Sequence, residues 1–338
     1  MNKQNVCFAR AYGEPREVGA EIGRQRADEI MDVLAALGVP ESLGEGQCDC
    51  CGMGRKQLLG NIERQAPDLL AEMDGLADGA GVPGASILLL NWMMQPMGVR
   101  AAALAFEDAP GGPAIALALG TPTDAPLCLA VTAIDVPGKA QVLQIGAPGL
   151  VGCVAGVNSH GIALGLVPMA SGEGCEDGIP SLMVARRVLD DARTLDEAME
   201  ILGAAKIACC PFDAIVADKE RVVLAERGVN DMTTREPVEG AVWTANDDAA
   251  REKLARIAAE KPHTAETAQE ALGDCEEPGA ICPCEWSEEA LAMGAVLRPR
   301  ARVIELAAGE PCKAKFRPFQ LKLAVTGAGS HLAGEYQT

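Results

Sequence analysis

Residues 151–167, Val-Gly-Cys-Val-Ala-Gly-Val-Asn-Ser-His-Gly-Ile-Ala-Leu-Gly-Leu-Val, contain two short apolar runs separated by a polar turn. The runs 151–157 and 162–167 are apolar at nearly every position, which is typical of strands buried on both faces. Residues 158–161 have the composition of a hairpin turn, and we expect His160 to be exposed on it. The stretch therefore predicts two neighbouring antiparallel strands inside a sheet.

Similar apolar runs lie on both sides of this hairpin and are separated by Gly, Pro, Asn and Asp. They occupy residues 114–119, 127–133, 140–145, 214–217, 222–225, 242–245, 292–297 and 303–307. Helical spacing of apolar residues predicts helices near 182–189, at 195–202 and at 249–259. Strands followed by helices and then by more strands predict a layered α+β body in which antiparallel sheets stack between helices.

The first hundred residues have a different pattern. Apolar residues recur at helical spacing over 17–37, 56–78 and 85–94, and the first of these segments ends at Gly38 before Pro40. We therefore expect an all-helical N-terminal lobe over 1–98 and a sandwich body over 99–323. Residues 324–338 would form a C-terminal tail, which we expect to be flexible.

Composition excludes several classes of partner. The 338 residues carry a formal net charge of −19, which argues against nucleic acid, because phosphate binding requires clustered Lys and Arg. The N-terminus has no charged segment followed by an apolar one, and no apolar run is long enough to span a bilayer. We expect a cytoplasmic protein with no membrane partner, and a homodimer as the commonest default for an oligomer.

Thirteen cysteines cannot all pair within one chain, so reduced thiols are the simplest expectation. Many of these cysteines can be small hydrophobic residues of the core. If they are, we expect no cofactor. The alternative is a zinc ion or an iron–sulfur cluster, because soft thiolates favour both, although the spacing matches no recognised ligand signature. The candidate ligands are two groups of neighbouring cysteines: Cys48, Cys50 and Cys51, and Cys275, Cys282 and Cys284.

Five motifs follow one another along nearly the whole chain. They are GEPREVGAEIG at 13–23, EMDGLADGAGV at 72–82, GVNSHGI at 156–162, GIP at 178–180 with Arg186 and Leu189 after it, and AGEPC at 308–312. Together they resemble the acyl-CoA:6-aminopenicillanic acid acyltransferase family, self-processing cysteine members of the N-terminal-nucleophile (Ntn) hydrolases. The resemblance implies an αββα sandwich and self-cleavage before a cysteine, whose new α-amine then serves as base for its own thiol.

The position of that cysteine is occupied by alanine. The family's motif falls on Ala101-Ala102-Ala103-Leu104-Ala105, and no Cys, Ser or Thr lies between Gln95 and Gly120. By the same resemblance, Asp124 and Asn246 correspond to remaining site residues, and Val167 stands where the family has an asparagine-rich strand end. Asp124 and Asn246 each have a simpler structural interpretation. Asp124 follows a turn and would cap it, and we favour Asn246 as the N-cap of the helix starting near Ala249.

We therefore expect a degenerate homologue that does not cleave itself and has no catalytic residue. Such a protein would bind a small acyl or amide-type molecule, or serve a structural role. Candidate ligand contacts are Ala101, Ala102, Asp124, Val167 and Asn246. The alternatives are an enzyme with rewired chemistry, through cysteine-bound metal or a substitute cysteine nucleophile, and a family-type acyltransferase or amide hydrolase.

Overall fold

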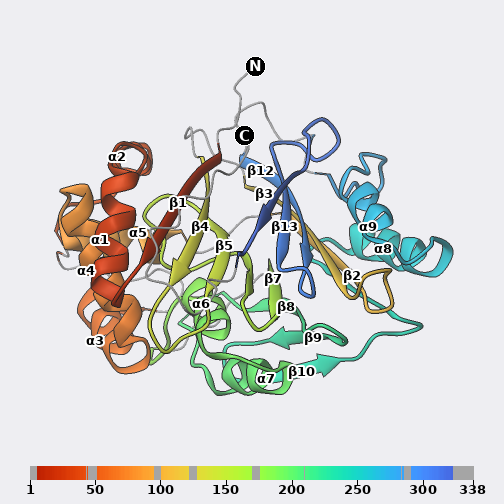
Figure 1. Ribbon diagram of the computed structural model, residues 1–338, viewed down its shortest axis with the longest axis horizontal. Coiled ribbons are helices and arrows are strands. Elements are labelled where there is room, and N and C mark those ends of the chain that lie inside the picture. The colour runs from red at the N-terminus through yellow and green to blue at the C-terminus, as the bar shows by residue number, and fades with distance from the viewer. Residues whose placement is uncertain are drawn as a thin grey trace.

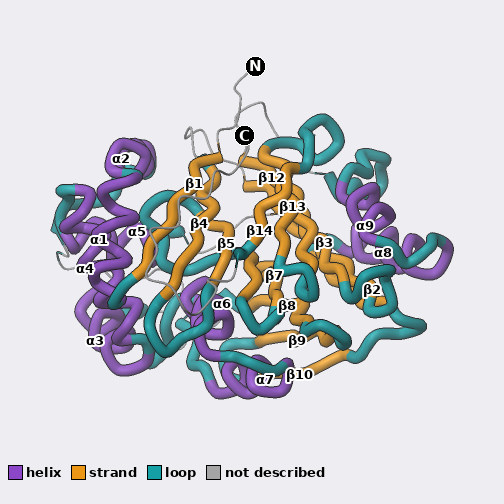
Figure 2. Tube along the Cα trace, viewed as in Figure 1, coloured by secondary structure: helices purple, strands orange, loops and turns teal. Residues whose placement is uncertain are grey.

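The computed structural model describes residues 6–42, 44, 52–94, 100–121, 128–169, 176–208, 210–282, 284 and 291–322. These residues form two sheets in the centre of the molecule with helices outside them (Figures 1 and 2). Among the described helices, none combines the length and the apolar character needed to span a bilayer. The predicted tail at 324–338 lies outside the described residues.

The larger sheet has eight strands. Its spatial order is β1 (Val6–Tyr12), β4 (Leu129–Asp135), β5 (Val142–Gly146), β6 (Ala155–Asn158), β7 (Ala163–Pro168), β8 (Phe212–Ala217), β9 (Val222–Arg227) and β10 (Met232–Arg235). All neighbours are antiparallel except β1 and β4, which pair in parallel with Val6 opposite Leu129. The prediction of purely antiparallel sheets is wrong at this edge, where the long connection from β1 to β4 allows parallel pairing.

The smaller sheet has six strands and is antiparallel throughout. Its order is β11 (Ala241–Ala245), β2 (Arg100–Phe106), β3 (Ala114–Thr121), β12 (Leu291–Arg298), β13 (Val303–Ala308) and β14 (Arg317–Gln320). Strands β2 and β3 of this sheet contact β7 and β8 of the larger one. The two sheets therefore pack face to face.

Two pairs of helices cover the outer faces. Helices α6 (Ser181–Asp191) and α7 (Leu195–Ala204) lie on the larger sheet, and α8 (Asp248–Glu260) and α9 (Ala265–Leu272) lie on the smaller one. Figure 1 shows the two pairs on opposite sides of the stacked sheets. The predicted αββα sandwich is confirmed.

Five helices precede the sandwich and lie beside β1 (Figure 1). They are α1 (Pro15–Gln25), α2 (Ala27–Ala36), α3 (Arg55–Gln65), α4 (Pro67–Ala80) and α5 (Gly84–Met93). The predicted single helices at 17–37 and 56–78 are each two helices, broken at Arg26 and at Ala66 before Pro67. The first described residues of the expected lobe form β1 (Val6–Tyr12), which belongs to the larger sheet, so this part of the chain is not wholly helical.

Helices α1 and α4 pack backbone against backbone. A Cβ atom added at Gly19 would lie 1.9 Å from the carbonyl oxygen of Glu72, and one added at Gly75 would lie 2.0 Å from that of Arg16. Only glycine permits such an approach, because any side chain would force the helices apart. These glycines belong to the motifs at 13–23 and 72–82, which therefore serve helix packing.

A buried arginine links this helical region to the sandwich. Arg186 in α6 donates through Nη1 and Nη2 to the two carboxylate oxygens of Glu72 in α4, at 3.2 and 3.1 Å. Its Nε donates to Asp190 at 2.8 Å, and Nη1 also donates to the carbonyl of Val151 at 3.1 Å. Arg186 has no exposed surface, so this ionic cluster is a permanent part of the interior.

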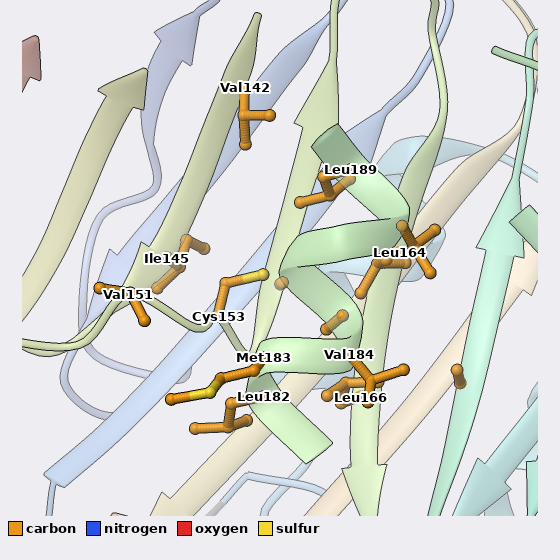
Figure 3. Packing of buried hydrophobic residues seen from close by; sticks show 14 of the residues in the cluster. Val142, Ile145, Val151, Cys153, Leu164, Leu166, Leu182, Met183, Val184 and Leu189 are labelled. Carbon is orange, nitrogen blue, oxygen red and sulfur yellow. The ribbon is translucent and has the colours of Figure 1, made fainter. Parts of the chain in front are cut away.

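The predicted hairpin is present as β6 and β7, but its first strand begins at Ala155, and residues 151–154 lie before the strand; α6 packs over the hairpin (Figure 3). The Asn158 side chain is buried at the turn, where its Oδ1 accepts the N–H groups of His160 and Ile162 at 3.0 and 2.9 Å. Its Nδ2 donates to the carbonyls of Leu189 and Ala192 beyond the sheet. His160 is exposed, as expected. Asn158 thus fixes the turn and ties it to α6.

Candidate functional site

The alanine run is strand β2, and its two faces have different neighbours. Ala101, Ala103 and Ala105 belong to the apolar cluster that contains the strands of the larger sheet. Ala102, Leu104 and Phe106 belong to a second cluster with residues of α8 and α9. Because side chains alternate along a strand, Ala101 and Ala102 point to opposite sides of the smaller sheet. Ala102 therefore does not share the space between the sheets with Ala101.

Asn246 binds the first residues of this strand. Its Oδ1 accepts the backbone N–H of Ala101 at 3.0 Å, and its own backbone N–H donates to the Ala101 carbonyl at 3.1 Å. Its Nδ2 donates to the Pro168 carbonyl at the end of β7, also at 3.1 Å. Asn246 therefore joins the two sheets at the position where the family's nucleophile is expected.

The N-cap role that we favoured for Asn246 is wrong. Helix α8 begins at Asp248, and its N-cap is Asp247, whose Oδ1 accepts the N–H of Ala250 at 2.8 Å. Because the N-cap directly precedes the first helical residue, Asp248, the cap position belongs to Asp247 and not to Asn246. The Asn246 side chain is thereby available to the neighbouring strands.

A buried polar pair crosses the space between the sheets close to this asparagine. The Thr244 hydroxyl in β11 donates to Oδ2 of Asp213 in β8. Thr244 lies opposite Ala103 in its own sheet, and Asp213 lies opposite Val167 in the other. Burial raises the pKa of the Asp213 carboxyl above its usual range. The sequence analysis missed this pair, although a single Asp inside the apolar run of β8 was a usable signal.

The structure brings together three of the five predicted ligand contacts. Ala101 and Asn246 are directly hydrogen-bonded, and Val167 precedes the Pro168 carbonyl that Asn246 binds. Val167 is fully buried and belongs to the same apolar cluster as Ala101. Ala102 lies on the other face of β2, and Asp124 lies outside the described residues.

One of the two predicted cysteine groups can be examined, because Cys48, Cys50 and Cys51 lie outside the described residues. Cys275, Cys282 and Cys284 meet, and Cys312 joins them. Their four Sγ atoms all lie within 4.8 Å of one another. Cys312 was missed as a cluster member because it comes from the turn between β13 and β14, far along the chain.

The αββα layering defines the class of the protein as an Ntn-hydrolase fold. The sequence model of the family described as acyl-coenzyme A:6-aminopenicillanic acid acyl-transferase matches residues 134–309, just over half of the chain. The chain belongs to this family. The matched range includes Arg186, Asp213 and Asn246, whereas β2 precedes it.

Individual relatives are distant. An uncharacterized protein of Archaeoglobus fulgidus is 25% identical over 247 residues, which cover 64% of this chain and 41% of that protein. The chain thus spans about two fifths of the length of this curated relative.

Among solved structures, a Caenorhabditis elegans orthologue of N-acylethanolamine-hydrolyzing acid amidase is 14% identical, with a TM-score of 0.44 over 59% of this chain and 93% of that one. Penicillin V acylase from Agrobacterium tumefaciens is 12% identical, with a TM-score of 0.34 over 62% and 75%.

Proposed function

We propose that this protein keeps the fold of its family without the self-cleavage and thiol chemistry, and serves as a binding or structural protein for a small acyl or amide-type molecule. The observation that carries the proposal is the surroundings of Ala101. Its side chain is a methyl group packed between the sheets, and its backbone N–H is hydrogen-bonded to Asn246.

The family reaction, as the resemblance implies it, requires a thiol and a free α-amine on the same residue. At residue 101 there is no thiol to attack the preceding carbonyl. Without that attack the bond before residue 101 is not cut by the family route, so its nitrogen stays a peptide N–H in strand β2, where Ala101 lies opposite Leu119 in β3. A peptide nitrogen carries no basic lone pair, so it cannot replace the amine that accepts the thiol proton.

Asn246 supports the same interpretation. An oxyanion donor must point its N–H groups at the carbonyl of the substrate. Here the Asn246 Nδ2 donates to the Pro168 carbonyl, and its Oδ1 accepts from Ala101. These bonds make Asn246 a connection between β2 and β7, and the Nδ2 hydrogen given to the Pro168 carbonyl is not offered to a substrate.

The Asp213–Thr244 pair favours an amide-type ligand. Apolar walls with a few polar groups are typical of small-molecule sites. Ala101, Ala103 and Val167 supply the apolar surroundings, and a carboxyl whose pKa is raised by burial supplies a proton donor or acceptor for an amide. We place the protein in the cytoplasm, because the eight cysteines of the described part are all free thiols, which suits a reducing compartment. For its oligomeric state we propose a homodimer, the commonest symmetric assembly.

Incubation of the full chain with a fluorogenic N-acyl amide tests the loss of chemistry. We expect no release of the fluorophore, no change on treatment with iodoacetamide, and no difference between the wild type and Asn246→Ala. Calorimetric titration with the same N-acyl amide tests binding, because the amide stays intact if the chemistry is lost, and we expect saturable binding. Turnover that iodoacetamide abolishes would contradict the proposal.

One observation favours the alternative of a substitute nucleophile. The hydrogen bond between the Cys7 and Cys128 thiols lowers the pKa of Cys128, whereas burial raises that of Cys153 to about 12. Because the thiolate is the reactive form, Cys128 is the candidate and Cys153 the inert comparison. If the amide is hydrolysed and Cys128→Ser alone abolishes the activity, this alternative replaces our proposal.

A further inference from the structure

The cysteine cluster is built from two segments of the chain. Cys275, Cys282 and Cys284 lie in the segment after α9, and Cys312 lies in the turn between β13 and β14. All four sulfur atoms lie within 4.8 Å of one another, although Cys312 comes 28 positions after Cys284 in the sequence. The fold thus brings the thiols together in three dimensions, without a recognisable sequence spacing.

The loop that carries three of the thiols is held in place by Asp274. Its backbone carbonyl accepts the N–H groups of Ile281 and Cys282 at 2.9 and 2.8 Å. Its carboxylate Oδ1 accepts from Lys253 Nζ at 2.7 Å and from the Glu276 N–H at 2.9 Å. These bonds close the loop on itself, so Cys275 and Cys282 face each other without help from a ligand.

The second segment is positioned by close packing. A Cβ atom added at Gly273 would lie 3.5 Å from the Cα atom of Cys312, so the backbones of the two segments are in contact. Cys282 is fully buried, whereas Cys312 is exposed. The cluster therefore has an anchored inner side and an open outer side through which an ion can enter.

Among the described residues, the hydrogen-bond partners of these thiols are weak. Cys284 donates to the sulfur of Cys275 at 2.9 Å, and Cys275 donates to the Gly273 carbonyl at 3.4 Å. Thiols are poor donors and poor acceptors, so these contacts contribute little. A soft cation would instead give every sulfur a strong bond.

We propose that Cys275, Cys282, Cys284 and Cys312 bind a single zinc ion in tetrahedral coordination. Thiolates bind zinc at about 2.3 Å, which places the four sulfurs of a tetrahedron about 3.8 Å apart. The distances between the sulfur atoms lie on both sides of this value, from 2.9 Å between Cys275 and Cys284 up to the limit of 4.8 Å, so rotation of the side chains must move that pair apart and bring the others closer. A four-iron cluster fits less well, because each cysteine would bind a different iron atom and the sulfurs would be spread more widely.

With four protein ligands the ion is structural, because no coordination position remains for a substrate. It would fix the loop at 273–284 to the β13–β14 turn. Within that loop, Glu277 lies 3.9 Å from the guanidinium of Arg100, and Gly279 packs against Ala249 in α8. The zinc would therefore stabilise the loop that borders the start of β2, and this role is independent of the proposed function.

The test is metal analysis of the full chain after dialysis against metal-free buffer. We expect one zinc per chain, and after replacement by cobalt the intense visible absorption of a tetrahedral cobalt–thiolate site. Cys312→Ser should weaken zinc binding by at least the roughly 10–100-fold that loss of a supporting residue costs, whereas Cys128→Ser, outside the cluster, should retain it.

A second measurement does not depend on folding of the variants. Chelation of the wild type should release the zinc and make the four thiols reactive to iodoacetamide together. The proposal is overturned if zinc titration gives no binding, if the protein contains acid-labile sulfide, or if peptide mapping shows a Cys275–Cys284 disulfide in place of the ion.

Discussion

The crossing of α1 and α4 and the start of β2 both precede the part of the chain that matches the family model, and they differ in what their residues do. At the crossing, Gly19 and Gly75 are required by backbone atoms at about 2 Å from any added Cβ. At the start of β2, Ala101 fills its place in a strand that many small residues could occupy. Packing geometry fixes residues whether or not a reaction takes place, whereas a nucleophile is fixed only by the reaction. On our proposal, this is why the fold persists where the chemistry does not.

The largest effect should come from the buried ionic cluster on the packing side of this comparison. Arg186→Met leaves Glu72 and Asp190 buried without a cation, and removal of one partner from such a cluster costs about 3–5 kcal/mol of unfolding free energy. Urea denaturation measures the loss of unfolding free energy. The control is Arg16→Met, whose ion pair with Asp78 is exposed and should matter little. Equal losses in the two variants would show that Arg186 does not join the helices to the sandwich.

The next effect concerns the crossing itself. Gly19→Ala should push α1 away from α4 and lower the unfolding free energy by about 1–3 kcal/mol, the usual cost of overpacking. The matched control is Gly60→Ala in α3, where an added Cβ meets only Arg64 Nη1 at 3.4 Å and alanine favours the helix. Thermal unfolding of the two variants should move in opposite directions, and a neutral Gly19→Ala would contradict the close crossing.

A smaller, pH-dependent effect is expected at the polar pair beside β2. Burial raises the pKa of Asp213 in the folded state above its unfolded value, so the folded protein holds this proton more tightly. The resulting stability is fully present below the unfolded pKa and is lost as pH rises through the folded pKa. Asp213→Asn has no carboxyl to ionise, so its unfolding free energy does not fall in this way as the pH rises. Urea unfolding across the acid-to-neutral range should therefore show the variant gaining stability relative to the wild type as pH rises; an opposite trend would contradict a raised pKa.

The smallest effect should come from placing a cysteine thiol at the position where the family has its nucleophile. Ala101→Cys places a thiol between the sheets, but the peptide N–H of residue 101 remains paired with Asn246, and we expect the chain to stay uncut. Ala102→Cys, on the opposite face of β2, is the control for the added sulfur. Denaturing electrophoresis shows whether either variant, Ala101→Cys or Ala102→Cys, is cut. Cleavage of Ala101→Cys alone would show that the site lacks only its nucleophile and is otherwise intact.

The sequence predicted the layers better than the contacts within them. Apolar runs such as 151–167 are strong signals, because a strand buried on both faces must be apolar throughout. Strand β2 was missed because alanine has little preference for strands and shows no alternation. The contacts of Asn246 with Ala101, of Thr244 with Asp213 and of Cys312 with the other thiols join residues far apart in sequence, and no local pattern encodes them.

The mass of the purified protein under denaturing conditions shows whether the chain is cut before residue 101. We expect one species at the mass of the uncut chain, about 35.1 kDa, because residue 101 cannot start the cleavage. Two fragments that meet between Arg100 and Ala101 would contradict it.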